Sequence, residues 1–430
     1  MFAISTATLV LVMSTATVDN NVLTIEHAVT SACENRAELI QAELSISSAE
    51  AGLLKSTLWF IPALSATAAV NAMEAEVPEI ESYSSSVGFN ASMSLFNLQS
   101  IGSRRVSAVS ADIAREAART TRATVIFDAA SSWYSMLQSQ ESLVLAELNL
   151  STQEEAFRVV ASKYDTGMIS RYEFLAGHVS LENTRPAFTA AQAEFENSLG
   201  DVSLATGIEN CCDMTMEGNL SDALPVTIPS SSGQLADLAV LESSETLMAR
   251  LSLESAEAAT FTAWGGYAPS VNLNGSVSWG NSADGFSELG DNDLTRTSTV
   301  GVSVSLPIFN SLASETAVRT ARYSELSAEY ELARVEKEVR QSSLEAWNNH
   351  RSASQRLIGA SALVLEAQEA LDIARITYQA GSITRLDLEQ SILGLISARN
   401  SSSQAQLAMR MAELNIAMLT GEIHEIWEVE

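Results

Sequence analysis

Cysteine and histidine are the side chains of this sequence best suited to covalent chemistry or metal binding. The three cysteines are Cys33, Cys211 and Cys212, an odd number with two of them adjacent. This arrangement does not suit a disulfide framework, and neither a CxxC motif nor a Cys/His zinc spacing occurs. We therefore predict no metal site and no cofactor, and we expect the histidines to be structural or exposed. The four histidines are His27, His178, His350 and His424.

No pattern typical of a catalytic site occurs elsewhere in the sequence. It contains no nucleophile–base pairing, no cluster of metal ligands and no glycine-rich phosphate loop. Acids one helical turn from a base, such as Glu154 before Arg158, are expected to form pairs on exposed helix faces. We therefore predict that the protein is not an enzyme.

The composition is acidic and favours long helices. The chain has 24 Lys and Arg against 53 Asp and Glu, a formal net charge of −29. Such a charge argues against nucleic acid and against anionic lipid headgroups as partners of the chain as a whole. It fits a secreted or halotolerant protein, or a conduit for cations. Residues 2–18 are apolar or small, and residues 1–20 resemble a signal peptide that lacks the usual basic start. After residue 20 no apolar run is long enough for a transmembrane helix, so strands would have to cross any membrane.

The chain contains the same pattern twice. The segment 163-KYDTGMISRYEFL-175 matches 377-TYQAGSITRLDLE-389 at an offset of 214 residues, and 204-LATG-207 matches 418-MLTG-421. This duplication predicts a first copy over 21–207 and a second copy over 233–421. A linker over 208–232 and a C-terminal tail over 422–430 complete the chain.

Each copy is expected to contain a first helical stretch, two strands, a very long helix and a return helix. The 64 residues from Ser103 to Thr166 contain neither glycine nor proline, and as one helix they would span roughly 95 Å. Tyr164 and Gly167 in one copy, and Gly381 in the other, mark the turns where the chain reverses. The expected helices are 24–58, 98–166 and 168–206 in the first copy, and 234–263, 310–380 and 382–420 in the second.

Four segments alternate apolar residues with small polar ones. In 269-PSVNLNGSVSWG-280 the odd positions are mostly apolar, and the even positions are serine, asparagine or glycine. About ten residues of this alternation are typical of a transmembrane strand with a wet interior face. The acidic segments 73–86 and 281–297 would be external loops, and the alternative is a pair of soluble hairpins on a helical body. The expected strands are about 61–72, 86–97, 268–280 and 298–309.

Four strands cannot close a barrel by themselves. Open sheet edges are not tolerated in lipid, so several chains would have to share one barrel. Two chains would supply eight strands with a filled interior, and three would supply twelve with an open lumen. The long helices would then form a hollow cylinder on the order of 100 Å in length, enough to reach across a periplasm.

These features together resemble the TolC-like outer-membrane efflux and secretion channels. The resemblance covers residues 21–421 and includes the duplication, the strand pairs, the run Leu-Pro-Ile-Phe at 306–309 and the motif Tyr378-x-x-Gly381. It implies an α+β membrane protein: a homotrimer with a shared twelve-stranded barrel in outer-membrane lipid and a periplasmic tunnel of helical hairpins. It also implies an equatorial girdle, a periplasmic adaptor partner and an inner-membrane RND or ABC transporter.

The same resemblance implies roles for residues at the periplasmic tip. Asp387 matches the family's acidic ring around the pore, and Gln390 stands at the next ring position. Three Asp387 carboxylates around one axis would attract cations and exclude anions, although a helix-start acid is the alternative.

The residues of the closing network depart from the family pattern. Tyr378 matches a tip tyrosine whose acidic partner would be Glu173, whereas Ile383 occupies the expected basic position and Arg385 lies nearby. The resemblance therefore implies a passive exit duct with an altered tip gate. Drug efflux, metal efflux and protein secretion stay open, with a helical scaffold or adhesin at the cell surface as the alternative.

Overall fold

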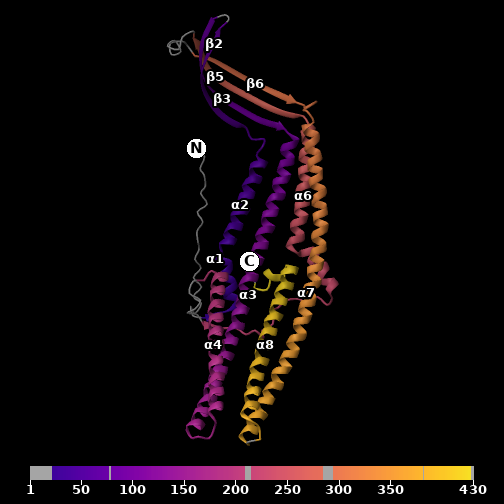
Figure 1. The fold of residues 1–430 in the computed structure, drawn as a ribbon. Coiled ribbons are helices and arrows are strands. Elements are labelled where there is room, and N and C mark those ends of the chain that lie inside the picture. Colours follow the sequence, from indigo (N-terminus) through magenta and orange to yellow (C-terminus); the bar gives the residue numbers. More distant parts are fainter. Residues whose placement is uncertain (1–21, 77–78, 209–214, 284–293, 381, 428–430) are drawn as a thin grey trace.

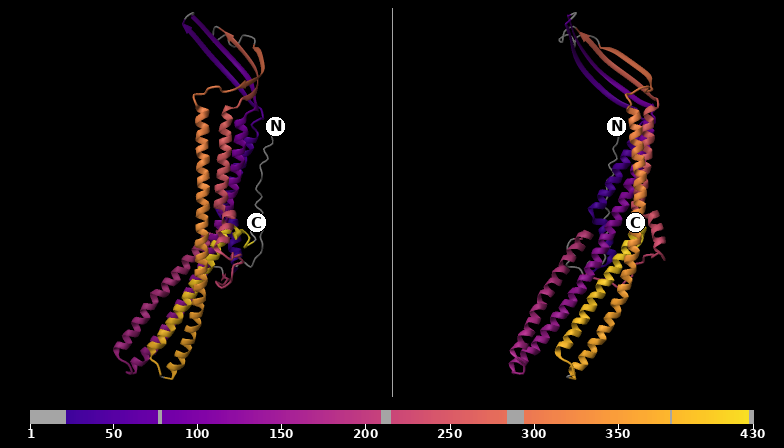
Figure 2. Two further views of the ribbon diagram at one scale, coloured as in Figure 1. Left: turned by 90° about the vertical axis from the view of Figure 1, so that its right-hand side faces the viewer. Right: turned by 45° about the vertical axis from the view of Figure 1, so that its right-hand side comes forward.

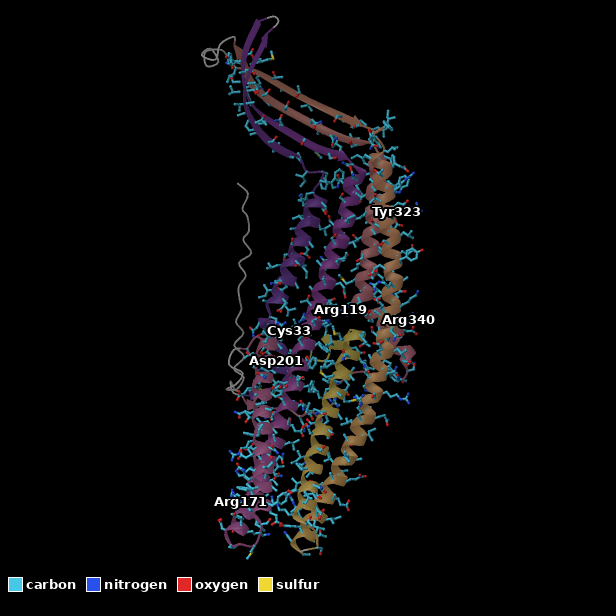
Figure 3. All side chains as sticks on the ribbon, viewed as in Figure 1. Cys33, Arg119, Arg171, Asp201, Tyr323 and Arg340 are labelled. Carbon is cyan, nitrogen blue, oxygen red and sulfur yellow. The ribbon has the colours of Figure 1, made fainter. Side chains whose placement is uncertain are left out.

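The computed structural model describes residues 22–76, 79–208, 215–283, 294–380 and 382–427 of the chain. The molecule is long and narrow, with a sheet at one end and two separate helical tips at the other (Figures 1 and 2). Arg171 lies at one of these tips (Figure 3). We call the middle region, where the shorter helices meet, the equator. None of the described helices combines the length and the apolar character needed to cross a membrane.

The two copies of the sequence repeat fold into the same order of elements. The first copy contains α1 (Ile25–Asn35), α2 (Ala37–Thr57), β2 (Ala63–Glu76), β3 (Glu79–Phe96), α3 (Leu98–Asp165) and α4 (Arg171–Thr206). The second contains α5 (Ser232–Glu242), α6 (Ser244–Trp264), β5 (Ser270–Ala283), β6 (Thr295–Ser305), α7 (Ala313–Gln379) and α8 (Arg385–Thr420). Short elements at the equator and near the sheet are β1 (Val22–Leu23), β4 (Thr215–Met216), η2 (Gly265–Tyr267) and η4 (Glu422–His424).

The first helical stretch of each copy is two helices, not the single helix expected over 24–58 and 234–263. Arg36 separates α1 from α2 with an extended backbone (φ −70°, ψ 124°), and Ser243 separates α5 from α6 in the same way (φ −65°, ψ 134°). The Arg36 guanidinium donates to the carbonyls of Leu204 and Ala205 at the end of α4. This contact satisfies helix-end carbonyls that lack a partner within α4.

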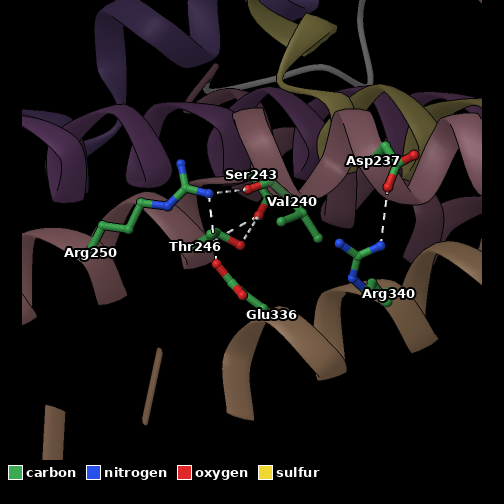
Figure 4. Close-up of polar contacts among 7 residues, drawn as sticks. All are labelled: Asp237, Val240, Ser243, Thr246, Arg250, Glu336 and Arg340. Atoms are coloured by element: carbon green, nitrogen blue, oxygen red, sulfur yellow. Dashed lines mark hydrogen bonds and ion pairs between the residues drawn. The ribbon is translucent and has the colours of Figure 1, made fainter. Parts of the chain in front are cut away.

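The break at Ser243 is held by polar contacts to its neighbours (Figure 4). The Ser243 hydroxyl caps α6 by accepting from the Thr246 N–H. Arg250 donates to the Val240 carbonyl at 3.2 Å and lies 3.8 Å from the Glu336 carboxylate of α7. An ion pair of 3.1 Å joins Asp237 of α5 to Arg340 of α7. These contacts fix both sides of the break against the long helix, a tertiary effect that helical periodicity does not encode.

The four long strands form one antiparallel sheet in the order β2-β3-β5-β6. The first hairpin is paired as far as Glu76 and Glu79, so most of the expected loop 73–86 is strand. Likewise β5 runs to Ala283 and β6 begins at Thr295, inside the expected loop 281–297. Backbone pairing needs no apolar side chain, and so it continues beyond the alternating pattern.

The last strand, β6, ends earlier than the expected 298–309 at its C-terminal end. It stops at Ser305, and the run Leu306-Pro307-Ile308-Phe309 is an exposed connection to α7, with Ile308 95% exposed. Proline has no N–H to donate to a strand partner, which explains the stop before Pro307. The connection then turns sharply through positive φ at Ser311 and Leu312.

The two faces of the sheet differ as the alternation predicts. On the polar face, Asn274 donates to Ser303 at 3.3 Å and the hydroxyls of Ser276 and Thr299 lie 2.6 Å apart. On the opposite face, apolar side chains such as Val300, 84% exposed, have no cover within one chain. An uncovered apolar face of this kind suits contact with lipid.

The helical body is built around α3. This helix contacts α1, α2, α4, α6 and α8, whereas α7 contacts α5, α6 and α8. Helices α2 and α4 lie one above the other beside α3, and α6 and α8 lie in the same way beside α7 (Figure 1). At the equator Trp133 of α3 is only 1% exposed and lies in the largest apolar cluster. Near the sheet, a Cβ on Gly102 would come 2.7 Å from Thr262 Cα, so α3 and α6 approach closely only because this residue is glycine.

Candidate functional site: the hairpin tips and the equator

The first hairpin tip reverses the chain through a left-handed glycine. Gly167 has φ 74°, and the N–H of Met168 donates to the Lys163 carbonyl at 2.9 Å. This bond is the one that ends a helix in a Schellman motif. In the second tip the N–H of Ser382 donates to the Thr377 carbonyl at the same distance, and these residues are the repeat counterparts of Met168 and Lys163. Gly381 itself lies outside the described residues.

Both return helices begin with the same capping box, one turn beyond the tip. In α4, Ser170 accepts from the Glu173 N–H at 3.3 Å, and the Glu173 carboxylate accepts from the Ser170 N–H at 3.0 Å. In α8, Thr384 and Asp387 form the corresponding pair, with the Asp387 carboxylate 2.7 Å from the Thr384 hydroxyl and 2.9 Å from its N–H. Glu173 and Asp387 are therefore counterparts in structure as well as in sequence.

Asp387 and Gln390 lie on the same exposed side of α8, one turn apart. Hydrogen bonds from the Thr384 hydroxyl and backbone N–H lower the pKa of the Asp387 carboxyl below its ordinary value. The carboxylate is thus ionised at neutral pH and held at the start of the helix, where the helix dipole also favours a negative charge. The capping role and an exposed charge near the tip are compatible in this geometry.

Arg385 connects the two hairpins near their tips. Its Nε donates to Glu389 Oε1 at 2.6 Å within α8, and its Nη1 donates to the Ala156 carbonyl of α3 at 3.1 Å. The second contact could not be found from the sequence, because its acceptor is a backbone atom. Arg171, the counterpart of Arg385 in the first hairpin, is exposed at the other tip (Figure 3).

The tyrosines of the two tips have different surroundings. Tyr164 stacks on Phe174 with ring centroids 4.8 Å apart, and Phe157 lies 5.5 Å from Phe174. Tyr378 is half-buried. The Glu173 carboxylate is used in its own capping box, and among the described residues no hydrogen bond joins it to Tyr378. The contact between Glu173 and Tyr378 therefore stays a prediction.

A buried ion pair at the equator was not predicted from the sequence. Arg410 and Glu413 of α8 are each 5% exposed and are joined through Arg410 Nη1 and Glu413 Oε2. Burial raises the pKa of Glu413, and both Arg410 and the backbone N–H of Leu224 counteract this rise. The bond from Leu224 connects the linker to α8. The only signal in the sequence is an Arg and a Glu three residues apart on an otherwise apolar helix face.

Nothing in the described residues groups three or more His, Cys, Asp or Glu side chains closely enough to hold a metal ion. Cys33 is half-buried at the equator and is a free thiol, and burial raises its pKa. Cys211 and Cys212 lie outside the described residues. The polar groups of the tips and the equator can thus hold helices together and present charge.

Comparison with known proteins relates both copies of the repeat to one family. A family model described as outer membrane efflux protein matches residues 28–207 and 235–422. The chain is 21% identical to the outer membrane protein TolC of Vibrio cholerae over 400 residues, which covers 91% of this chain and 89% of that protein. It is 20% identical to TolC of Escherichia coli over 365 residues, with 80% and 71% covered.

Solved structures show the same fold. The crystal structure of CusC superimposes with a TM-score of 0.79 at 18% identity, covering 92% of this chain and 91% of that one. The open state of the Neisseria gonorrhoeae MtrE outer membrane channel gives a TM-score of 0.78 at 19% identity, covering 92% and 88%. The expected fold class, long helical hairpins plus four strands per chain in a tandem repeat, is confirmed. Since the family model matches most of both copies, the chain belongs to the outer membrane efflux protein family and is an outer-membrane protein with its helical body in the periplasm.

Proposed function

We propose that this protein is the passive exit duct of a tripartite efflux pump, formed by three copies of the chain. The observation that carries the proposal is the sheet, in which β2 and β6 are each paired on one side only. Unpaired strand edges are not stable in lipid, so β6 of one copy must pair with β2 of the next. Three copies give a twelve-stranded barrel whose polar faces surround a lumen.

The helices extend this lumen through the periplasm. Three pairs of hairpins around the barrel axis enclose a tunnel that narrows at the tips. Asp387 forms the constriction and favours cations, with Gln390 one turn further along α8. A periplasmic adaptor and an inner-membrane transporter supply substrate and energy, and the duct itself performs no chemistry. Efflux of small molecules is favoured over protein secretion because the matching family is described by efflux.

The gate is the connection between the two hairpins of each copy. Arg385 holds α8 to the Ala156 carbonyl of α3 at 3.1 Å, so opening the tip requires that this bond break. Tyr378 and Glu173 add a second contact between hairpins when the three copies assemble. Opening then moves the α7–α8 hairpin away from the α3–α4 hairpin.

Conductance in planar bilayers tests the duct and its constriction. Purified trimer should conduct and should prefer cations, and Asp387→Ala should reduce that preference. The control is Asp201→Ala, which removes an exposed aspartate of α4 near the equator (Figure 3). A protein that is monomeric in detergent and gives no conductance would contradict the duct. An unchanged cation preference in Asp387→Ala would contradict the constriction alone.

A second pair of variants tests the gate. Arg385→Ala should raise the conductance of the resting, closed trimer, because it removes the link to α3. Arg171→Ala, the matched change in the first hairpin, should leave the conductance near that of the parent. Equal effects of the two variants would remove Arg385 from the gate. Secretion of a polypeptide, rather than resistance to small toxic compounds, in a strain that depends on this protein would contradict the efflux assignment.

A further inference from the structure

One arginine lies on the apolar face of the sheet, at the end far from the helices. Arg296 of β6 is exposed and pairs in register with Trp279 of β5. Because the register also pairs Val271 with Val304 and Leu273 with Val302, Arg296 and Trp279 lie on the same face as these apolar residues. Arg296 is the only lysine or arginine in β2, β3, β5 and β6.

The arginine is part of a short aromatic row across three strands. Its guanidinium carbon lies 6.0 Å from the centre of the Trp279 ring, within the range of a cation–π contact. The Trp279 ring in turn meets Phe89 of β3 edge to face, with centroids 6.3 Å apart. The row places a cation directly beside the outward aromatic residues of the sheet.

The distance of this row from the helical end of the sheet matches the thickness of the apolar band on a membrane barrel. Nine residue steps separate Ser270, at the base of β5, from Trp279. At about 3.3 Å per residue and a tilt of about 40°, they rise roughly 23 Å, close to the ~25 Å band of a membrane barrel. Trp279 and Arg296 therefore lie where hydrocarbon gives way to lipid headgroups on the external side.

In the proposed barrel, Arg296 would need a polar partner on the face turned toward lipid. An arginine on a lipid-facing surface is costly unless its head reaches a polar partner, and the guanidinium binds phosphate through two parallel hydrogen bonds. The chain carries a net charge of −29, so the protein as a whole repels anions. Binding of an anion at Arg296 would therefore depend on this local site. The tryptophan face positions the guanidinium at the headgroup level without satisfying its N–H groups.

We propose that Arg296 and Trp279 form a binding site for the phosphate of an anionic lipid in the outer leaflet, one site per copy. The inference rests on the proposed trimeric barrel, which turns this face toward lipid. The occupant is a lipid phosphate and not free phosphate, because the apolar residues beneath the arginine, Val277 and Val300, receive the acyl chains.

Native mass spectrometry of the detergent-solubilised trimer tests the site. The probes are a phosphorylated outer-leaflet glycolipid and the same glycolipid after enzymatic dephosphorylation. The parent trimer should bind the phosphorylated form preferentially, and Arg296→Gln should weaken that binding by about tenfold, the loss expected for one charge-assisted contact. Arg296→Lys should restore part of it, since lysine keeps the charge but not the two parallel bonds. Arg171→Gln, at the opposite end of the molecule, is the matched control.

Three results would overturn the site. One is equal lipid binding by the parent and Arg296→Gln trimers. Another is displacement of the lipid by millimolar inorganic phosphate, which would show a site for the free anion. The third is loss of trimer in Arg296→Gln without a change in lipid bound per remaining trimer, which would assign the arginine to subunit pairing. Conductance of the parent protein is measured in parallel. If the parent neither trimerises nor conducts, the proposed duct fails, whereas a conducting parent with no lipid preference removes the lipid site alone.

Discussion

The α3–α4 and α7–α8 hairpins come from one repeated pattern and share their turns and capping boxes, yet they have different interiors. At the equator, Trp133 of α3 corresponds to Trp347 of α7 at the offset of 214 residues. Trp133 is 1% exposed, whereas Trp347 is half-buried beside a smaller cluster. The reason is position: α3 is surrounded by five helices, and α7 lies at the edge of the body. Duplicated sequence therefore reproduces local structure but not burial.

The return helices α4 and α8 also differ in which side chains they bury. Leu199 of α4 contributes an apolar side chain to the large cluster, and its counterpart in α8 is Glu413, buried with Arg410. The tips differ as well. Tyr164 packs on Phe174 and Phe157 in the first, while the counterparts of those phenylalanines in the second are Leu388 and Leu371. The first tip is thus packed by aromatic rings, whereas leucines, among them the buried Leu371, stand at the same positions in the second.

The largest expected effect on stability comes from replacing each of these two tryptophans by alanine. Trp133→Ala should destabilise the protein by about 3–5 kcal/mol, the usual cost of emptying a buried aromatic site. Trp347→Ala should cost clearly less, because its ring is only half-buried. The measurement is chemical unfolding of the detergent-solubilised protein at one fixed protomer concentration. Equal losses of unfolding free energy would show that assembly buries the two tryptophans alike, which would contradict the difference drawn between α3 and α7.

Breaking the buried ion pair of α8 should have a similar or slightly smaller effect. Arg410→Met leaves Glu413 buried without its partner and should cost about 3–5 kcal/mol, whereas the double variant Arg410→Met/Glu413→Leu should recover most of the loss. The double variant makes α8 resemble α4, where Leu199 stands at the place of Glu413. If the double variant is as unstable as the single one, the pair has a role beyond the charge balance.

The single variant also has a defined pH dependence. Removing Arg410 raises the pKa of Glu413 further, because Arg410 is one of the two groups that lower it. A carboxyl whose folded pKa exceeds its unfolded pKa binds its proton more tightly in the folded state. Stability should therefore be greatest below the unfolded pKa of about 4.3 and should fall as pH rises through the folded pKa. Unfolding at pH 5 and pH 8 checks the sign, with Arg334→Met on an exposed helix face as a control that should show little change at either pH.

An exchange of tip residues should have a moderate and local effect. Phe174→Leu removes the ring stacked on Tyr164 and should loosen the first tip by about 0.5–1.5 kcal/mol, the usual value of an aromatic pair. Hydrogen exchange of backbone amides at 160–176 should speed up, while amides at 382–390 should not change. Leu388→Phe is the reciprocal variant in α8. Faster exchange at both tips in Phe174→Leu would show that the hairpins do not open separately.

The smallest effect concerns the charge of Asp387. Thr384→Val removes the hydroxyl that holds the pKa of Asp387 below its ordinary value, so this pKa should rise. On acidification, the cation preference of the channel should then be lost at a higher pH than in the parent. Ser170→Ala, the matched change in α4, should leave the pH dependence of the preference where it was. No shift in Thr384→Val would mean that other copies, and not the capping box, set the ionisation of Asp387.

Some features of this protein follow from the sequence without any tertiary information. The offset of 214 residues and the absence of glycine and proline from Ser103 to Thr166 predict two long hairpins, with a turn at Gly167. The period-two alternation predicts four strands with unlike faces. These predictions succeed because helical and strand periodicity, turn residues and capping pairs are local, and each is encoded within a few adjacent residues.

Other features depended on which elements became neighbours. The contacts that hold the breaks at Arg36 and Ser243, and the link from Arg385 to Ala156, involve partners distant in sequence or backbone atoms that carry no sequence signal. The same holds for burial: Trp133 and Trp347 stand at matching repeat positions, and the number of helices around each decides which one is enclosed. The sequence by itself therefore determined where helices, strands and turns form. Which side chains are buried, including the core residues and the ion pair of α8, was decided only when the two copies packed together, because burial depends on the neighbouring elements.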